Sequence, residues 1–166
     1  MPDQNTMDFR VGIGFDVHPL VPGRKLVLGG VEVPHHAGLA GHSDGDVLVH
    51  AIMDALLGAA GLGDKGTHFP SSDPQYADIS SLILLSTVAE LVQAAGWRIS
   101  NVDATMLAQM PRLAPFVNNM RTQVGEALST PSDRVGIKVT TTDFLGFVGR
   151  EEGIAAYAVA SLITAL

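Results

Sequence analysis

Asp16-Val17-His18 is the most direct indication of chemistry in the sequence. In an extended segment, residues i and i+2 point to the same face, so the carboxylate and the imidazole converge. An aspartate and a histidine are two suitable zinc ligands, short of a tetrahedral set, but the same pair also forms ordinary surface hydrogen bonds. Gly12 and Gly14 precede the motif without forming a dinucleotide-binding fingerprint, because Val17 stands where that fingerprint needs a glycine or alanine.

A second candidate motif is a histidine within a helical, apolar pattern. His50 follows Asp46 by one helical turn and precedes Asp54 by one turn, so the three share a helix face. His50 is either a metal ligand whose second ring nitrogen is oriented by a carboxylate, or a core histidine satisfied by its helix neighbour. His42 and Ser43 stand at the helix entrance, where an anion finds free N–H groups, and Ser43 is expected to cap the helix.

A third candidate is the threonine-rich segment Thr140–Asp143, which leads towards Arg150. Three hydroxyls, a carboxylate and an arginine can surround a phosphate-bearing ligand. A threonine run is also good strand sequence, so the pattern alone does not decide between binding and structure.

Composition limits the possible ligands and partners. The chain has 10 Lys and Arg against 17 Asp and Glu, a net charge of −7, which argues against nucleic acids and anionic membranes as partners. An anionic ligand would therefore need metal ions or backbone N–H groups to offset repulsion. The absence of cysteine excludes disulfides, thiolate-bound zinc and thiol catalysis. Since 46% of residues are apolar and only 16% are charged, part of the surface is expected to be covered in an oligomer.

The elements that must position these residues alternate between strand and helix, which predicts a single α/β or α+β domain over 9–166, with 1–8 as a flexible extension. No apolar run is long enough for a membrane span, and no signal peptide is recognisable, so we expect a cytoplasmic protein, or a plastid one if a transit peptide has been removed. The expected elements are a strand at Phe9–Asp16, a hairpin at Lys25–Val33, helices at Val47 to about Gly61, Ser80–Ala95 and Pro115–Leu128, strands at Arg98–Gln109 and Val135–Thr140, and a tail at Ile154–Leu166 that is ambiguous between strand and helix.

Four segments occur in an order that identifies a family: GFDVH, GHSDGDVLVHAIMDALLGAAGLGD, FPSSDP and TTTDFLGFVGREEG. Together they closely resemble the 2C-methyl-D-erythritol 2,4-cyclodiphosphate synthases of the non-mevalonate isoprenoid pathway, from Phe9 to Leu166. The resemblance implies an α+β fold (an α/β sandwich), with one mixed β-sheet and helices packed on one face. It also implies a homotrimer whose sheets face the trimer axis, active sites between subunits, and an apolar central channel able to take an isoprenoid diphosphate.

The resemblance resolves the open alternatives in favour of metal chemistry. It implies that Asp16, His18 and His50 bind one zinc ion and leave a fourth coordination position open, as in catalytic zinc sites. It also implies a second divalent ion, Mg²⁺ or Mn²⁺, which Asp143 is expected to reach. The implied reaction is attack of the 2-phosphate of 4-diphosphocytidyl-2C-methyl-D-erythritol 2-phosphate on its own β-phosphorus, which closes the cyclic diphosphate and expels CMP.

The resemblance also implies roles for further side chains. His42 and Thr141 are expected to be catalytic, as stabilisers of the transition state. The expected substrate contacts with the reacting phosphates, the erythritol end, the cytosine and the phosphate wall are Ser43, Asp64, Gly66, Phe69, Pro70, Ser71, Ser72, Asp73, Ala108, Met110, Pro111, Arg112, Leu113, Ala114, Thr140, Thr142, Phe147 and Arg150.

Three positions depart from the family pattern. Ser71 stands where aspartate is common, Asp143 where glutamate is usual, and Arg112 where lysine is common. Two alternative functions remain: a non-catalytic trimer that binds isoprenoid phosphates, and a zinc phosphohydrolase that uses the open coordination position to activate water.

Overall fold

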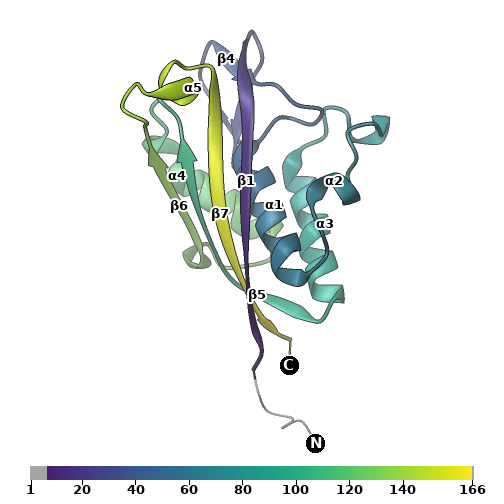
Figure 1. Ribbon diagram of the computed structural model, residues 1–166. Helices are drawn as coiled ribbons and strands as arrows, with labels where there is room; N and C mark the ends of the chain where they lie inside the picture. The colour runs from purple at the N-terminus through teal and green to yellow at the C-terminus, as the bar shows by residue number, and fades with distance from the viewer. Residues whose placement is uncertain (1–6, 166) are drawn as a thin grey trace, which may run out of the picture.

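A five-stranded mixed sheet organises the chain (Figure 1). The computed structural model describes residues 7–165. The strand order is β4-β1-β7-β5-β6; β5 and β6 are parallel and the other neighbours are antiparallel. The strands of this sheet are β1 (Phe9–Pro22), β4 (Ala37–Leu39), β5 (Trp97–Leu107), β6 (Val135–Thr140) and β7 (Gly153–Thr164), and a separate hairpin consists of β2 (Leu26–Leu28) and β3 (Val31–Val33).

Three long helices cover one face of the sheet, as Figure 1 shows. This arrangement confirms the expected α+β fold. The ambiguous tail is strand β7, and the expected loops contain two short helices. The helices are α1 (Val47–Ala60), α2 (Lys65–His68), α3 (Ser81–Ala94), α4 (Val117–Ala127) and α5 (Gly146–Gly149), with 3₁₀ turns η1 (Pro74–Tyr76), η2 (Ala114–Phe116) and η3 (Ser132–Arg134).

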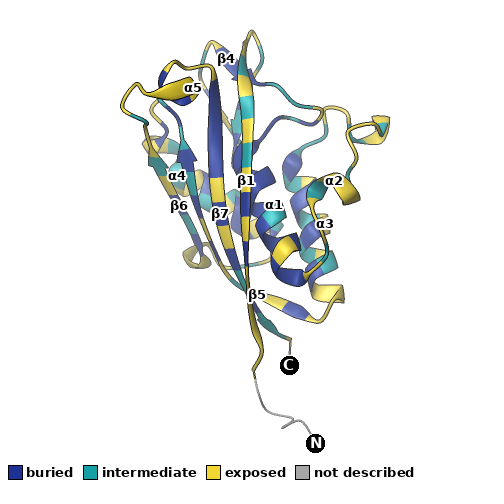
Figure 2. Cartoon of the chain, viewed as in Figure 1, coloured by how far each residue is buried: buried dark blue, intermediate teal, exposed yellow. Residues whose placement is uncertain are grey.

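The other face of β1 and β7 is open and apolar. Exposed residues on this face alternate with buried residues along each strand (Figure 2). Since side chains alternate across a strand, one set of residues faces the helices and the other faces outward. The exposed apolar side chains of this face are Phe9, Val11, Ile13, Phe15, Val17, Tyr157 and Val159.

Glycines on the inner face of β1 allow α1 to lie directly on the strand. A Cβ atom added at Gly12 would stand 2.1 Å from the carbonyl oxygen of Ala55, and one at Gly14 would stand 1.9 Å from that of Ala51. Only glycine permits an approach this close. The same face of β1 continues with Asp16 and His18, so the packing that needs the glycines also carries both side chains to α1.

Asp46, and not Ser43, caps the N-terminus of α1, which corrects the sequence-based expectation. The Asp46 carboxylate accepts a hydrogen bond from the N–H of Val49 at 3.1 Å. It also accepts bonds from the N–H groups of Gly29 and Gly30, at 2.9 and 2.7 Å, in the turn between β2 and β3. Asp46 is completely buried, and these contacts from the distant hairpin explain why it, rather than Ser43, takes the capping position.

Residues 1–6 of the expected N-terminal extension lie outside the described residues. At the start of the described chain, the N–H of Asp8 donates to the hydroxyl of Thr164 at 3.1 Å. Within residues 7–165, no helix combines the length and the apolar character that crossing a membrane would require.

Candidate active site

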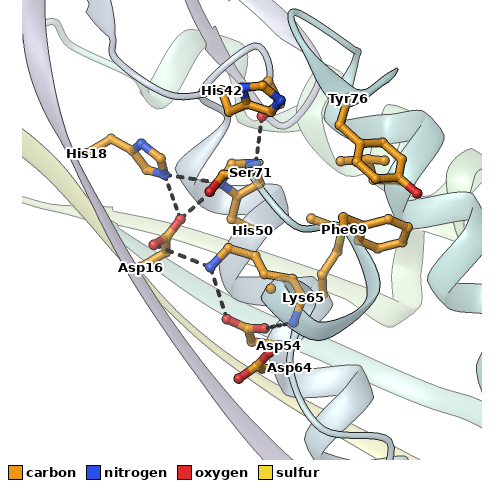
Figure 3. Close-up of a pocket in the computed structure, with 14 residues that line it drawn as sticks. Asp16, His18, His42, His50, Asp54, Asp64, Lys65, Phe69, Ser71 and Tyr76 are labelled. Atoms are coloured by element: carbon orange, nitrogen blue, oxygen red, sulfur yellow. Dashed lines mark hydrogen bonds and ion pairs between the residues drawn. The ribbon is translucent and has the colours of Figure 1, made fainter. Parts of the chain in front are cut away.

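A cavity of about 420 Å³ lies between β1, the entrance of α1, and the segment from α2 to η1. Figure 3 shows side chains from all these elements pointing into it. Nine residues singled out from the sequence line the cavity: Asp16, His18, His42, Ser43, His50, Asp64, Gly66, Phe69 and Ser71. Five others that line it were not singled out as site residues: Met53, Asp54, Lys65, Tyr76 and Leu84.

Three side chains in the cavity direct donor atoms towards one another. Asp16 Oδ2 is 2.8 Å from His18 Nε2 and 3.0 Å from His50 Nδ1. The two ring nitrogens are 3.1 Å apart. Asp16, His18 and His50 thus form a group of possible metal ligands, with donor atoms all within 4.8 Å of one another (Figure 3).

The chemistry of this donor set fits a divalent metal ion. The second ring nitrogen of His18, Nδ1, is in close contact with the carbonyl oxygen of Ala40, which can only accept a hydrogen bond. The neutral ring therefore carries its proton on Nδ1 and presents a lone pair on Nε2 to Asp16 and His50. Ligands about 2.0–2.1 Å from a tetrahedral zinc lie about 3.3 Å from one another, slightly further apart than the 2.8–3.1 Å seen here. Carboxylate and imidazole donors are ordinary ligands for zinc.

The charges around Asp16 favour its ionised form. Burial opposes ionisation, but contacts with the imidazole rings of His18 and His50 and the charge of Lys65 hold the pKa of the Asp16 carboxyl well below its usual range. Burial also disfavours a charged His18, yet the protonated ring can donate Nε2–H to Asp16, and this hydrogen bond raises the pKa of His18 above its ordinary value. A metal ion must therefore compete with a proton for His18 but not for Asp16.

Lys65 is a cation in the cavity that the sequence motifs did not single out. Its Nζ lies 3.1 Å from Asp54 Oδ2 and 3.5 Å from Asp16 Oδ1. Its backbone N–H also donates to Asp54 Oδ1 at 2.7 Å. Lys65 is the only lysine or arginine among the described residues that line the cavity. Lys65 lies between Asp64 and Gly66, two expected substrate contacts, and this position in the sequence could have indicated that it belongs to the site.

Side-chain caps hold the segment that forms the far wall of the cavity. Asp64 caps α2 by accepting the N–H of Thr67 at 2.9 Å. Asp73 caps η1, and its carbonyl oxygen lies 2.9 Å from His42 Nε2, which ties the segment to the entrance of α1. Phe69 packs edge-on against Tyr76, with ring centroids 5.5 Å apart. Pro70 and Ser72 belong to the same segment without lining the cavity.

The remaining expected site residues gather elsewhere in the chain. They lie in two segments, Ala108–Ala114 after β5 and Thr140–Arg150 between β6 and β7. These segments contact each other, because the N–H of Ala108 donates to the carbonyl oxygen of Thr140 at 3.0 Å. Within the described chain, the structure does not bring them to the cavity. The expected residues concerned are Ala108, Met110, Pro111, Arg112, Leu113, Ala114, Thr140, Thr141, Thr142, Asp143, Phe147 and Arg150.

The three charged side chains of this second group, Arg112, Asp143 and Arg150, are exposed. Asp143 has a left-handed backbone with φ of 52°, and its carboxylate accepts a 3.4 Å hydrogen bond from the Thr141 hydroxyl. It stands outside the three-donor group around Asp16. Arg150 pairs through Nε with the Glu152 carboxylate at 2.8 Å, so this guanidinium faces a carboxylate of its own chain.

Comparison with known proteins decides the family. The family model described as "YgbB family" matches residues 9–163. The chain belongs to the YgbB family. A relative from Syntrophomonas wolfei subsp. wolfei, named 2-C-methyl-D-erythritol 2,4-cyclodiphosphate synthase, is 61% identical over 150 residues, covering 90% of this chain and 96% of that protein.

Solved structures of similar proteins share the fold. The bifunctional IspDF from Campylobacter jejuni superposes with a TM-score of 0.93 at 39% identity; the match covers 96% of this chain and 43% of that longer one. IspF from Plasmodium falciparum, solved as a CDP complex, superposes with a TM-score of 0.84 at 30% identity, covering 95% and 97% of the two chains. These matches confirm the family resemblance of the four sequence segments.

Proposed function

We propose that the chain is a 2-C-methyl-D-erythritol 2,4-cyclodiphosphate synthase, a cyclising lyase of isoprenoid precursor biosynthesis that releases CMP. The observation that carries the proposal is the group formed by Asp16, His18 and His50, which is intact in a chain of the YgbB family. Because all three donors are present, the alternative of a non-catalytic phosphate-binding trimer is not favoured.

The reaction balances without an external acid or base. A non-bridging oxygen of the substrate's 2-phosphate forms a bond to the β-phosphorus. The bond from the β-phosphorus to the oxygen that bridges it to the α-phosphate breaks, and that oxygen leaves with CMP. Because nucleophile and electrophile belong to one molecule, most of the work is to hold them together, and orientation of this kind lowers barriers by up to roughly 7–11 kcal/mol.

Residues of the cavity, of the adjoining segment and of the second group perform that positioning. Asp16, His18 and His50 would hold zinc, and Asp143 would contribute to a site for Mg²⁺ or Mn²⁺. When bound, these cations offset the negative charge of the phosphates and polarise their P–O bonds. The remaining proposed roles are stabilisation of the transition state by His42 and Thr141, binding of the reacting phosphates by Ser43, and binding of the erythritol end by Asp64, Gly66, Phe69, Pro70, Ser71, Ser72 and Asp73.

The second group of residues binds the cytidine and the phosphates in this proposal, through Ala108–Ala114 and Thr140–Arg150. Because these segments do not line the cavity of their own chain, the proposal includes a homotrimer in which they meet the cavity of a neighbouring copy. The exposed apolar face of β1 and β7 supports such an assembly. In that trimer the face lines a central channel whose apolar walls suit an isoprenoid diphosphate.

The test is turnover of the cytidyl diphosphate substrate in the presence of Zn²⁺ and Mg²⁺, with product structure and CMP release followed by NMR. We expect cyclic diphosphate and CMP in equal amounts. His50→Ala should reduce turnover by at least 100-fold and abolish stoichiometric zinc binding. His36→Ala removes an exposed histidine outside the site and should change neither. Normal turnover by His50→Ala would refute the metal assignment, and a linear product would indicate a phosphohydrolase.

A further inference from the structure

Ser81, in the first turn of α3, contacts the ring of His50 on the side away from Asp16. Its Oγ lies 3.0 Å from His50 Nε2. The same Oγ lies 2.5 Å from Asp44 Oδ1, and the backbone N–H of Ser81 donates to Asp44 Oδ2 at 3.0 Å. Ser81 is completely buried and His50 is 6% exposed, so these contacts are sheltered from water.

The direction of each hydrogen bond follows from which groups can donate. A carboxylate can only accept, so the Ser81 hydroxyl must give its proton to Asp44. The Ser81 oxygen then has only lone pairs left to present to His50. His50 must therefore donate from Nε2–H, and its Nδ1 keeps a lone pair directed at Asp16 and His18.

We infer that Ser81, held by Asp44, is a positioning residue that fixes His50 in the tautomer with its proton on Nε2. The inference rests on the proposed function, because the freed Nδ1 lone pair is what the zinc site needs. Ser81 Oγ provides an acceptor for the proton on the second ring nitrogen of His50, as the carbonyl oxygen of Ala40 does for His18. A carbonyl is an acceptor by its nature, whereas a hydroxyl becomes one only when a third group takes its proton, and Asp44 is that group.

These hydrogen bonds disfavour the other His50 tautomer, in which Nδ1 carries the proton. In the absence of metal, Asp16 Oδ2 stands 3.0 Å from His50 Nδ1 and would accept a proton from it. That tautomer would need a hydroxyl donor at Nε2. Ser43 Oγ, 3.1 Å from Nε2, is the other hydroxyl there. It also lies 3.4 Å from the Ser81 oxygen, to which it can donate its proton.

The carboxylate that orients His50 is Asp44, and not Asp46 or Asp54, which share the helix face of His50. Asp46 turns to backbone N–H groups, and Asp54 pairs with Lys65, so neither orients His50. Asp44 reaches His50 only through Ser81, which is 31 positions further along the chain than His50.

The decisive variant is Asp44→Asn, which has nearly the same shape but can donate. The Ser81 N–H donates to Asp44 Oδ2 at 3.0 Å and the Asp46 N–H donates to Asp44 Oδ1 at 3.1 Å, so the single amide oxygen of the variant can accept from only one of them. Where it accepts from the Ser81 N–H, the amide NH₂ faces Ser81 Oγ. The Ser81 hydroxyl proton is then free to turn to His50 Nε2. Nitrogen-15 NMR of the imidazoles in metal-free protein above neutral pH reads the tautomer directly. We expect His50 to carry its proton on Nε2 in the wild type and to shift towards the Nδ1–H form in Asp44→Asn.

Zinc affinity gives a second readout that does not depend on turnover. Competition with a chelator should show binding weakened about 10-fold or more in Asp44→Asn and in Ser81→Ala, the range typical of lost partners behind a metal ligand. Ser80→Ala is the matched control, because the Ser80 side chain makes no capping hydrogen bond at the neighbouring position. It should leave tautomer and affinity unchanged. Thermal unfolding with chelator present identifies any variant that fails to fold.

The inference is overturned if wild-type His50 carries its proton on Nδ1, or if folded Asp44→Asn and Ser81→Ala proteins both keep the wild-type tautomer and zinc affinity. Because the tautomer is measured without metal, this result is separate from the fate of the proposed function. A wild-type protein that shows the Nε2–H tautomer but binds no zinc would refute the metal assignment and leave the Asp44–Ser81 contact supported.

Discussion

Gly14 of β1 lies against the carbonyl oxygen of Ala51 in α1 so closely that a Cβ at residue 14 would stand 1.9 Å from that oxygen. His50 precedes Ala51, and Asp16 follows Gly14 by one strand repeat on the same face. This contact therefore sets the separation between two of the three proposed zinc ligands.

Gly14→Ala should damage the metal site without changing any ligand. The methyl group forces α1 away from β1, because backbone atoms cannot move aside as a flexible side chain can. We expect a loss of about 1–3 kcal/mol in the free energy of unfolding and a zinc affinity at least 10-fold weaker. Urea unfolding in the presence of chelator and zinc competition measure the two effects.

Gly58→Ala provides the matched control on the same helix. A Cβ at Gly58 meets nothing within 4 Å, and the residue is exposed. Replacing an exposed helical glycine should stabilise the protein by about 0.5–1 kcal/mol and leave zinc affinity unchanged. Equal zinc affinity in Gly14→Ala and the wild type would contradict the role given to this packing contact.

Asp46 should make stability depend on pH in a defined window. Burial, followed by the charge of Asp44, raises the pKa of Asp46 to about 6, against the opposing effect of three backbone hydrogen bonds. The unfolded carboxyl titrates near about 3.9. Between about pH 4 and pH 6 the folded state therefore holds a proton that the unfolded state has lost, so the Asp46 contribution to stability falls as pH rises.

Asp46→Asn isolates this effect, because its amide does not titrate. The amide NH₂ would face a backbone donor such as the N–H of Gly30, so the variant should be less stable by about 1–3 kcal/mol. The wild-type advantage should be largest at pH 4, shrink up to about pH 6, and then stay level. Urea unfolding of metal-free protein at several pH values tests this, and an advantage that grows with pH would contradict it.

Local patterns in the sequence were sufficient for part of the site. The i, i+2 spacing predicted that Asp16 and His18 converge, and the alternating pattern of β5 and the helix of His50 were also predictable. The cap of α1 was assigned wrongly to Ser43, because N–H groups of the distant Gly29-Gly30 turn select Asp46 instead. A single-sequence pattern does not register such contacts between remote segments.

Other features depend entirely on tertiary packing. Ser81 reaches His50 only because α3 begins beside α1, and no local spacing relates the two residues. The tail at β7 became a strand by pairing with both β1 and β5, which its apolar sequence did not specify. The family resemblance predicted that Thr141 and His42 act on the same transition state. Within one chain, however, His42 lines the cavity and Thr141 does not.

Lys65 should affect metal and substrate in opposite directions. Its charge lies 3.5 Å from Asp16 Oδ1, where it repels a cation held by that carboxylate and attracts an anionic substrate. In Lys65→Gln we expect several-fold tighter zinc binding and a KM for the cytidyl substrate about 10-fold higher, the loss expected for one charged contact. Zinc competition and steady-state kinetics measure the two quantities.

Lys25→Gln is the control for Lys65, because its ammonium forms an exposed ion pair with Glu32 and neither residue lines the cavity. It should leave both zinc affinity and KM at wild-type values. A Lys65→Gln enzyme with weaker zinc binding and unchanged KM would show instead that the lysine acts mainly by keeping Asp16 ionised.

Ile13, on the open face of β1, tests whether this face joins the copies of the proposed trimer. The side chain is 70% exposed in the isolated chain and stands among the other outward apolar residues of β1 and β7. A charge buried there without a partner would oppose association. Ile13→Glu should therefore shift the protein from trimer to monomer in analytical ultracentrifugation. Turnover should fall with the trimer population, because Thr140–Arg150 would no longer reach the cavity of a neighbouring copy.

Ile83→Glu separates loss of assembly from a general effect of charge. Ile83 is 58% exposed on α3, which lies on the helical side of the sheet, away from the proposed contact. This variant should remain trimeric and active. Because Ile13 lies on the outer face of the sheet, Ile13→Glu monomers should keep the three-donor group and still bind zinc. An Ile13→Glu protein that stays trimeric at micromolar concentration would remove the open face of β1 from the trimer interface.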